Sequence, residues 1–206
     1  YRFNEAVDGL LHFIWHSYCD WYVELIKPSL GSNDSPVAAE IKATASTILA
    51  GTLRLLHPFM PYLTEELNQK IFQSGDMLIA ANWPQATAAN YLDAVDDIQF
   101  LISLVTEIRY IRSEMSVPTS AKPMLQIRGM SAAQNALLDS QCAALRRLAR
   151  VSGVTVVDRF AKGTARGSVE GVSIGLPLAD ILDLDAEAAR LKKDISVVEN
   201  EINKIS

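Results

Sequence analysis

The sequence lacks several features that would each indicate a particular class of protein. Its 206 residues include only two cysteines, Cys19 and Cys142, which lie far apart and form no CxxC pair. A thiolate zinc site and a disulfide framework are therefore not indicated, and a reducing, cytoplasmic setting fits. No apolar run approaches the roughly 18 residues that a membrane-spanning helix needs, and no signal peptide is visible. Because no methionine begins the chain, we expect it to be part of a longer protein.

Positive charge is scarce in most of the chain, and the net charge is −5. Residues 1–100 hold 5 basic and 12 acidic side chains, and residues 167–206 hold 4 and 8. Residues 101–166, in contrast, hold 10 basic and 4 acidic side chains. A basic stretch of this kind is where phosphate groups would bind. A chance cluster of cations on a solvated surface would give the same composition, so both interpretations are open.

Apolar residues at three- and four-residue steps predict four amphipathic helices in the first part of the chain. The first runs from about Arg2 to Lys27, and the second begins at Ser35-Pro36, where proline suits the first turn. The third follows the break at Pro58 and Pro61, with Leu63, Leu67 and Ile71 as its stripe. The fourth covers about residues 91–113. Four helices of this length form an antiparallel bundle, which we place at residues 1–117.

Short strands and one helix follow, which predicts a small α+β unit over residues 118–181. Alternating apolar residues predict strands at 124–128, 154–157 and 172–176. Ser131 and Gln134 form a capping box for a helix to about Arg150, which Gly153 is expected to stop. Residues 163–167, with a glycine at each end, are expected to form a turn.

The last segment, residues 182–206, predicts the start of a coiled-coil arm. Its apolar residues step alternately by four and three, which is the spacing of a heptad seam. The seam consists of Leu184, Ala188, Leu191, Ile195, Val198, Ile202 and Ile205. One such helix needs a partner, so either two molecules pair here or the returning helix of a hairpin lies outside this chain.

Three strings of residues resemble the valyl-tRNA synthetase family. They are YRFNEAVDGLLHFIWHSYCDWYVELIKP at the start, LRLLHPFMPYLTEEL from Leu53 to Leu67, and LPLADILDLDAEAARLKKDI from Leu176 to Ile195. The first two occur in weaker form in isoleucyl and leucyl enzymes, which are therefore the alternative families. The third string is typical of the valyl family. Isoleucyl enzymes commonly carry a cysteine zinc cluster near the C-terminus, and this sequence has none.

The resemblance implies a mainly α fold, in which a helical bundle holds the anticodon arm of tRNA. The small α+β unit follows, and the terminal coiled-coil helix would brace the outer corner of the tRNA. The intact enzyme would be a cytoplasmic monomer that uses ATP and Mg²⁺ to attach valine to tRNA, and it would edit threonyl-tRNA.

The HIGH and KMSKS signatures of the ATP site do not occur in this sequence. We therefore expect this chain to be non-catalytic and without a cofactor of its own. Its expected partners are the tRNA and the catalytic and editing domains of the same polypeptide.

The candidate RNA-binding residues are six cations and one tryptophan: Arg109, Arg112, Lys122, Arg128, Arg146, Arg150 and Trp15. Arg109 and Arg112 end the fourth helix and would line the groove for the anticodon loop, although a helix dipole also favours cations there. A second basic group would follow the stem backbone, or else would complement a helix dipole and aid solubility: Arg146, Arg147 and Arg150, with Arg159, Lys162 and Arg166 around the strands. Trp15 would stack on an unpaired base, or else pack at the edge of the core. Charge reversal at Arg109 and Arg112 in the full-length enzyme should impair tRNA charging and spare formation of valine adenylate.

Two other interpretations compete with this one. His12 and His16 have the spacing of a helical metal pair, but they fall on the polar face, so we expect no metal. We expect His57, at a chain break, to be a structural hydrogen-bonding residue. The chain could also be a non-enzymatic scaffold that dimerises through residues 184–206. In that case it should form a concentration-dependent dimer that is lost when residues 180–206 are removed, whereas a monomer in both cases would favour the hairpin.

Overall fold

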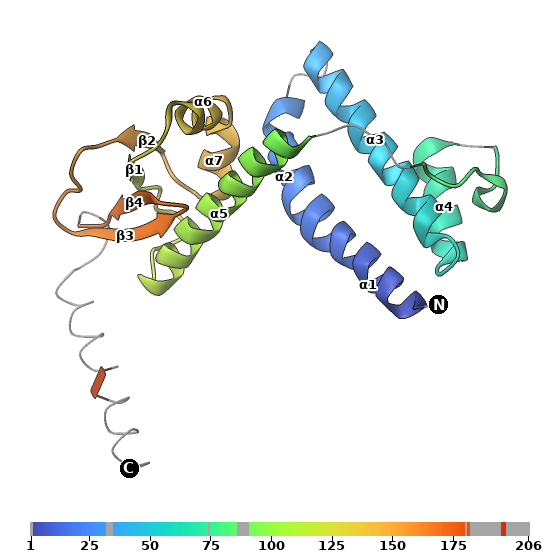
Figure 1. Ribbon diagram of the computed structural model, residues 1–206, viewed down its shortest axis with the longest axis horizontal. Helices are drawn as coiled ribbons and strands as arrows, with labels where there is room; N and C mark the ends of the chain where they lie inside the picture. The colour runs from blue at the N-terminus through green and yellow to red at the C-terminus, as the bar shows by residue number, and fades with distance from the viewer. Residues whose placement is uncertain are drawn as a thin grey trace. The chain divides into compact units, whose positions relative to one another are not determined.

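The computed structural model describes residues 2–31, 35–73, 75–85, 91–179, 181 and 195–196 (Figure 1). The chain divides into two compact units, Tyr1–Asn90 and Tyr91–Ser206. Within the described part, no helix is both long and apolar enough to cross a membrane. The predicted heptad seam lies outside the described residues except for Ile195, which is helical and exposed.

The first unit begins with a helical segment that contains several kinds of helix. It consists of α1 (Phe3–His12), a π-helical stretch η1 (Phe13–Val23), α2 (Glu24–Ile26) and the 3₁₀ turn η2 (Lys27–Leu30). Next come α3 (Pro36–Leu56), α4 (Pro61–Phe72) and the short 3₁₀ turn η3 (Leu78–Ala80). The three helices predicted for this region are confirmed. The π-helical stretch was not predicted.

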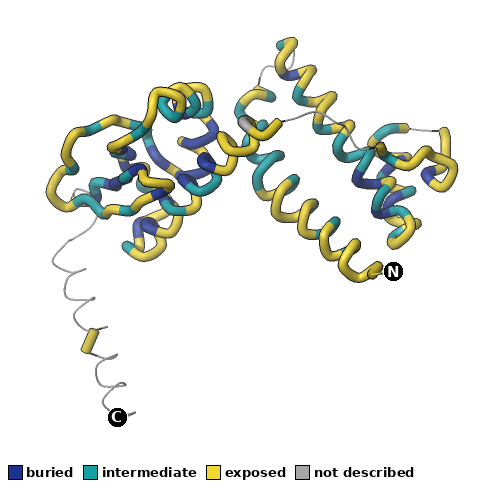
Figure 2. Tube along the Cα trace, in the orientation of Figure 1, coloured by how far each residue is buried: buried dark blue, intermediate teal, exposed yellow. Residues whose placement is uncertain are grey.

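The buried residues of the first unit lie on α3, α4 and η3. Its buried apolar side chains are Ala38, Leu53, Leu56 and Leu78. None of the described residues 3–30 is buried, and Figure 2 shows the first helix in the exposed and intermediate colours. One hydrogen bond that ties this segment to α3 runs from the Tyr18 hydroxyl to the Ala45 carbonyl, 3.1 Å apart. Partial burial, and then the neighbouring Tyr22 and Cys19, raise the pKa of Tyr18.

The predicted apolar stripe of α4 is wrong in part. Leu63 and Ile71 are exposed, whereas Thr64 and Asn68 are buried. Thr64 can enter the interior because its hydroxyl donates to the Met60 carbonyl at 2.9 Å, so that the buried polar atom is satisfied. The helix therefore packs on α3 with a polar side chain that bonds to its own backbone.

In the second unit, residues 91–179 form one long helix, two short helices and a four-stranded sheet. The helices are α5 (Leu92–Glu114), α6 (Ala132–Ser140) and α7 (Cys142–Leu148). The strands are β1 (Met124–Arg128), β2 (Gly153–Val156), β3 (Thr164–Val169) and β4 (Val172–Pro177). The sheet order is β2-β1-β4-β3, with β1 and β2 parallel and the other pairs antiparallel. α5 contacts β3, α6 and α7, and its apolar residues from Phe100 to Ile111 join the core.

The capping box predicted at the start of α6 is confirmed. The Gln134 backbone N–H donates to Ser131 Oγ at 3.2 Å, and the Ser131 N–H donates to Gln134 Oε1 at 2.9 Å. The single helix expected after it is divided at Gln141 into α6 and α7. Its end is set by Arg150, which has a φ of 52°, and not by Gly153, which begins β2.

The turn predicted at residues 163–167 is wrong in part: Gly163 lies in a turn and has a φ of 70°, but the residues from Thr164 to Gly167 belong to strand β3. Gly167 misled the prediction, since glycine usually weakens a strand. Here α5 lies directly over it: an added Cβ would collide with the Glu107 carboxylate and would lie 3.0 Å from Ile111 Cδ1. The tight turn between β3 and β4 falls at Glu170 and Gly171, whose φ values of 49° and 83° suit a two-residue hairpin.

The division between the units does not coincide with the boundary predicted at residues 117 and 118. The helix expected as the fourth member of the bundle is α5, which belongs to the second unit. The first turns of α5 expose the apolar side chains of Leu92 and Val95. Because α5 is assigned to the second unit, its packing with the helices of the first unit and the boundary at residue 117 stay predictions.

Candidate nucleic-acid interface

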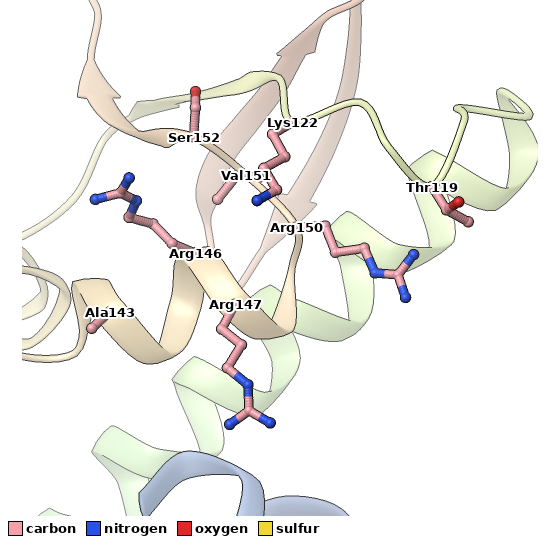
Figure 3. Close-up of a pocket in the computed structure, with 8 residues that line it drawn as sticks. All are labelled: Thr119, Lys122, Ala143, Arg146, Arg147, Arg150, Val151 and Ser152. Atoms are coloured by element: carbon pink, nitrogen blue, oxygen red, sulfur yellow. The ribbon is translucent and has the colours of Figure 1, made fainter. Parts of the chain in front are cut away.

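Four cationic side chains surround an open cavity of about 620 Å³ in the second unit, here called the basic pocket (Figure 3). Its lining residues are Thr119, Lys122, Ala143, Arg146, Arg147, Arg150, Val151 and Ser152. Within the described part of the chain, no carboxylate lines this cavity. In a chain of net charge −5, this is a local concentration of positive charge.

The parallel pairing of β1 and β2 explains why these distant residues meet. Met124 pairs with Gly153, so the segments that enter the two strands lie side by side. The Ser152 N–H donates to the Pro123 carbonyl at 3.0 Å and ties these segments together. Lys122 arrives on one segment, and the arginines arrive on α7 and the residues after it. The site is thus a product of the β1–α6–α7–β2 crossover.

The cationic groups do not converge on one point. Figure 3 shows Arg146, Arg147 and Arg150 pointing in three different directions, with Lys122 between Arg146 and Arg150. A single small anion needs donors that converge on it. Side chains that diverge suit a ligand with several negative charges spaced along it, such as a nucleic-acid backbone.

A second cavity, of about 350 Å³, adjoins the first and shares Thr119 and Arg150 with it. Arg109 and Arg112 from α5 line it. Arg109 Nε donates to the Leu148 carbonyl at 3.1 Å. These two arginines hold α5 against the C-terminal end of α7, where helical carbonyls have no partner within their own helix.

Arg112 faces the protein interior. It is only 8% exposed, and its guanidinium donates to the carbonyls of Arg150 at 3.2 Å and Pro118 at 3.0 Å. Burial lowers the pKa of Arg112, and the positive charge of Arg150 lowers it further. The guanidinium of Arg112, in the last turn of α5, thus bonds to the segment after α7 through Arg150 and to the segment after α5 through Pro118. Contact of Arg112 with RNA stays a prediction.

Arg150 occupies a backbone conformation that normally suits glycine. With its φ of 52°, it follows the end of α7, and the Val151 N–H donates back to the Arg146 carbonyl at 3.2 Å. This is the arrangement of a Schellman motif, in which the left-handed position is usually glycine. An arginine there costs free energy, and its charge also repels that of Arg112. Such a residue is a candidate for a functional role.

The structure brings together some of the predicted RNA-binding residues and separates others. Lys122, Arg146 and Arg150 meet in the basic pocket. Arg128 is exposed at the end of β1 and lines neither cavity, and Trp15 is exposed in the first unit. Arg147, which the sequence grouped with Arg146 and Arg150, lines the same pocket. The prediction did not include the hydroxyls of Thr119 and Ser152, which only the register of β1 and β2 could have indicated.

The histidine pair of the first helical segment is solvent-exposed. The rings of His12 and His16 are 4.7 Å apart, and His16 Nδ1 lies 3.4 Å from Asp20 Oδ2. Among the residues that the structure describes, no group of three or more possible metal ligands is found.

The family model described as the anticodon-binding domain of tRNA ligase matches residues 1–128. The chain is 41% identical over 211 residues to valine–tRNA ligase of Rhizobium meliloti (strain 1021), a match that covers 100% of this chain and 22% of that protein. It is 39% identical over 209 residues to the valine–tRNA ligase of Mesorhizobium japonicum, with 100% and 22% covered. It is 41% identical over 210 residues to that of Caulobacter vibrioides, with 99% and 23% covered. The chain therefore spans less than a quarter of the length of these relatives.

Proposed function

This chain belongs to the family of anticodon-binding domains of tRNA ligases, and we propose that it binds the anticodon arm of tRNA as part of a valine–tRNA ligase. The observation that supports RNA binding most directly is the basic pocket, with four cations and no carboxylate among its described lining residues. The named relatives, similar over the whole chain, support valine as the amino acid of the parent enzyme.

In this proposal the basic pocket holds the sugar–phosphate backbone and positions the RNA without reading its sequence. Lys122, Arg146, Arg147 and Arg150 contact separate phosphates, since they point in different directions. The hydroxyls of Thr119 and Ser152 donate to phosphate oxygens. Arg109 and Arg112 keep the end of α7 in place, so they act on the RNA through Arg150. Arg128 and Trp15 would contact the RNA outside this pocket.

The parent enzyme would attach valine to tRNA with ATP and Mg²⁺, on parts of the polypeptide outside the segment that this chain matches. Binding here would fix the tRNA so that its acceptor end reaches those parts. We further propose that the parent is a cytoplasmic monomer and that residues 182–206 start an arm that braces the tRNA.

A salt-dependent titration of the full 206-residue chain tests this proposal. Valine tRNA and an unrelated tRNA are titrated at low and moderate salt against wild type, Lys122→Gln, Arg146→Gln and the control Lys70→Gln. Lys70 is an exposed lysine of the first unit that pairs with Glu66 at 2.8 Å.

We expect Lys122→Gln and Arg146→Gln each to weaken binding and to lower the slope of log K against log salt by about 1. Lys70→Gln should match wild type. Equal, salt-independent binding of both tRNAs by all four proteins would show that the basic pocket does not bind RNA.

A further inference from the structure

The first unit contains a cavity that the basic pocket does not explain. It measures about 360 Å³ and lies where the end of α3, the start of α4 and the segment around η3 meet. Its lining includes Arg54, His57, Asn82 and Trp83. The volume falls within the range of pockets for small organic groups, and the lining combines an aromatic ring with a few polar groups.

The indole ring of Trp83 is accessible to a ligand, and hydrogen bonds hold the segment that carries it. The Leu78 N–H, at the start of η3, donates to Glu65 Oε2 of α4 at 2.9 Å, and Leu78 itself is buried. The Ala81 N–H closes the turn on the Leu78 carbonyl at 3.0 Å. Trp83 follows two residues later and is 58% exposed. A large aromatic side chain on an anchored segment, half open to solvent, is suited to stacking on a planar ligand.

His57 lines the same cavity with one ring nitrogen already engaged. Its Nδ1 lies 2.8 Å from Thr64 Oγ1. When the hydroxyl proton of Thr64 is donated to the Met60 carbonyl, this oxygen is the acceptor toward His57. In that tautomer of the neutral ring, Nδ1 is the donor and Nε2 is an acceptor. Thr64 is buried, so this arrangement is fixed by the core.

The remaining polar groups complete a site with both donors and acceptors. The amide of Asn82 can donate and accept at the same time, which matches the mixed edge of a nucleobase. Arg54 adds a planar cation that can bind a phosphate oxygen or stack on a base. A purely apolar partner would leave these groups unused, and a lone phosphate would not use the ring of Trp83.

We propose that this cavity binds one unpaired nucleobase of RNA. The base stacks on Trp83, its polar edge bonds to Asn82 and to Nε2 of His57, and Arg54 contacts the adjoining phosphate. This inference rests on the proposed function and adds to it a second site that binds a different part of the RNA. The basic pocket holds the backbone of the RNA, and the Trp83 cavity takes a base from its single-stranded loop, where sequence-specific reading of RNA occurs.

The test compares an RNA hairpin that has an unpaired loop with a fully paired duplex of the same stem sequence. Both are titrated against the full chain as wild type, Trp83→Ala, Trp83→Phe, Tyr62→Ala and Lys122→Gln. Tyr62 is the matched control, because it is an aromatic residue of the same unit that is 91% exposed and lines none of the cavities described above. Circular dichroism verifies that each variant is folded.

We expect Trp83→Ala to weaken hairpin binding roughly 5- to 150-fold, the range for loss of one base–aromatic stack, and to leave duplex binding unchanged. Trp83→Phe should retain most of the affinity, and Tyr62→Ala should match wild type. Binding of the hairpin should also quench tryptophan emission in wild type more than in Trp83→Phe.

Unchanged hairpin binding by Trp83→Ala, with weakened binding of both RNAs by Lys122→Gln, would overturn the base-binding site and leave the proposed function intact. Equal weakening of hairpin and duplex by Trp83→Ala would also overturn it, because a base site cannot act on a duplex without unpaired bases. If wild type binds neither RNA, the proposed function fails and the base-binding site fails with it.

Discussion

Replacing Arg112 with methionine should destabilise the second unit without removing a contact to RNA. The guanidinium is buried and donates to two carbonyls, those of Arg150 and Pro118. Hydrogen bonds from a charged donor contribute about 1.5–3 kcal/mol each, and a buried carbonyl left without a donor costs about 1–3 kcal/mol. The repulsion by Arg150 and the cost of burying the charge oppose these gains. We therefore expect a net loss of about 2–3 kcal/mol in the free energy of unfolding.

The distribution of tryptophan allows the two units to be followed separately. All three tryptophans, Trp15, Trp21 and Trp83, lie in the first unit, whereas both units contribute helix to far-ultraviolet circular dichroism. The urea unfolding curve of Arg112→Met, measured by circular dichroism, should show a component whose midpoint is lower by roughly 1 M. This shift follows if the free energy of unfolding falls by about 2 kcal/mol per M of urea. The transition seen by tryptophan emission should not move.

An exposed arginine of the same unit serves as the control for the loss of charge. Arg159→Met should leave both transitions within about 0.5 kcal/mol of wild type, as is usual for surface substitutions. If Arg112→Met unfolds like wild type and yet binds tRNA as weakly as Arg146→Gln does, Arg112 contacts RNA and our account of its role is wrong.

Three further substitutions test other parts of the structure. Arg150→Gly should raise the stability of the second unit by about 0.5–1 kcal/mol in urea unfolding, because glycine adopts a positive φ freely. The same substitution should weaken tRNA binding in a titration, because it removes a cation of the basic pocket. Gly175→Ala should cost about 1–3 kcal/mol by circular dichroism, because the new Cβ would lie 2.8 Å from Phe160 Cδ1. Thr64→Val should cost about 1–2 kcal/mol, seen in tryptophan emission, because His57 Nδ1 loses its partner. Wild-type stability in any of these variants would contradict the contact invoked for it.

The sequence predicted most of the helices and three of the four described strands, β1, β2 and β4, because their apolar periods and end signals are local. The capping box at Ser131 is the clearest case, because both of its partners lie within four residues. The errors arose where contacts with a segment distant in the sequence determine the local structure. The sequence alone could not place Gly167 in a strand, because the reason is the helix α5 that lies over it. Likewise Thr64 replaces Leu63 in the interior because its hydroxyl bonds back to Met60.

The sequence identified several cations of the candidate site by position, among them Lys122, Arg146 and Arg150, but not how they are arranged. Composition located the cations in residues 101–166, but it could not distinguish a guanidinium that faces solvent from one that bonds to a carbonyl 38 residues away, as in Arg112 and Arg150. Periodicity also could not show that Trp83 and His57 line one cavity. Both features depend on packing between segments that are separated in the sequence.

The order of the strands affects how this part of the polypeptide can be made. The last strand among the described residues, β4, is an inner one, paired with β1 on one side and β3 on the other. During synthesis, therefore, β3 has no neighbour within the sheet until Val172–Pro177 leaves the ribosome, and β1 has only β2. A nascent chain that stalls just before Val172 would hold every cation of the basic pocket and yet lack the strand that joins the sheet into one piece.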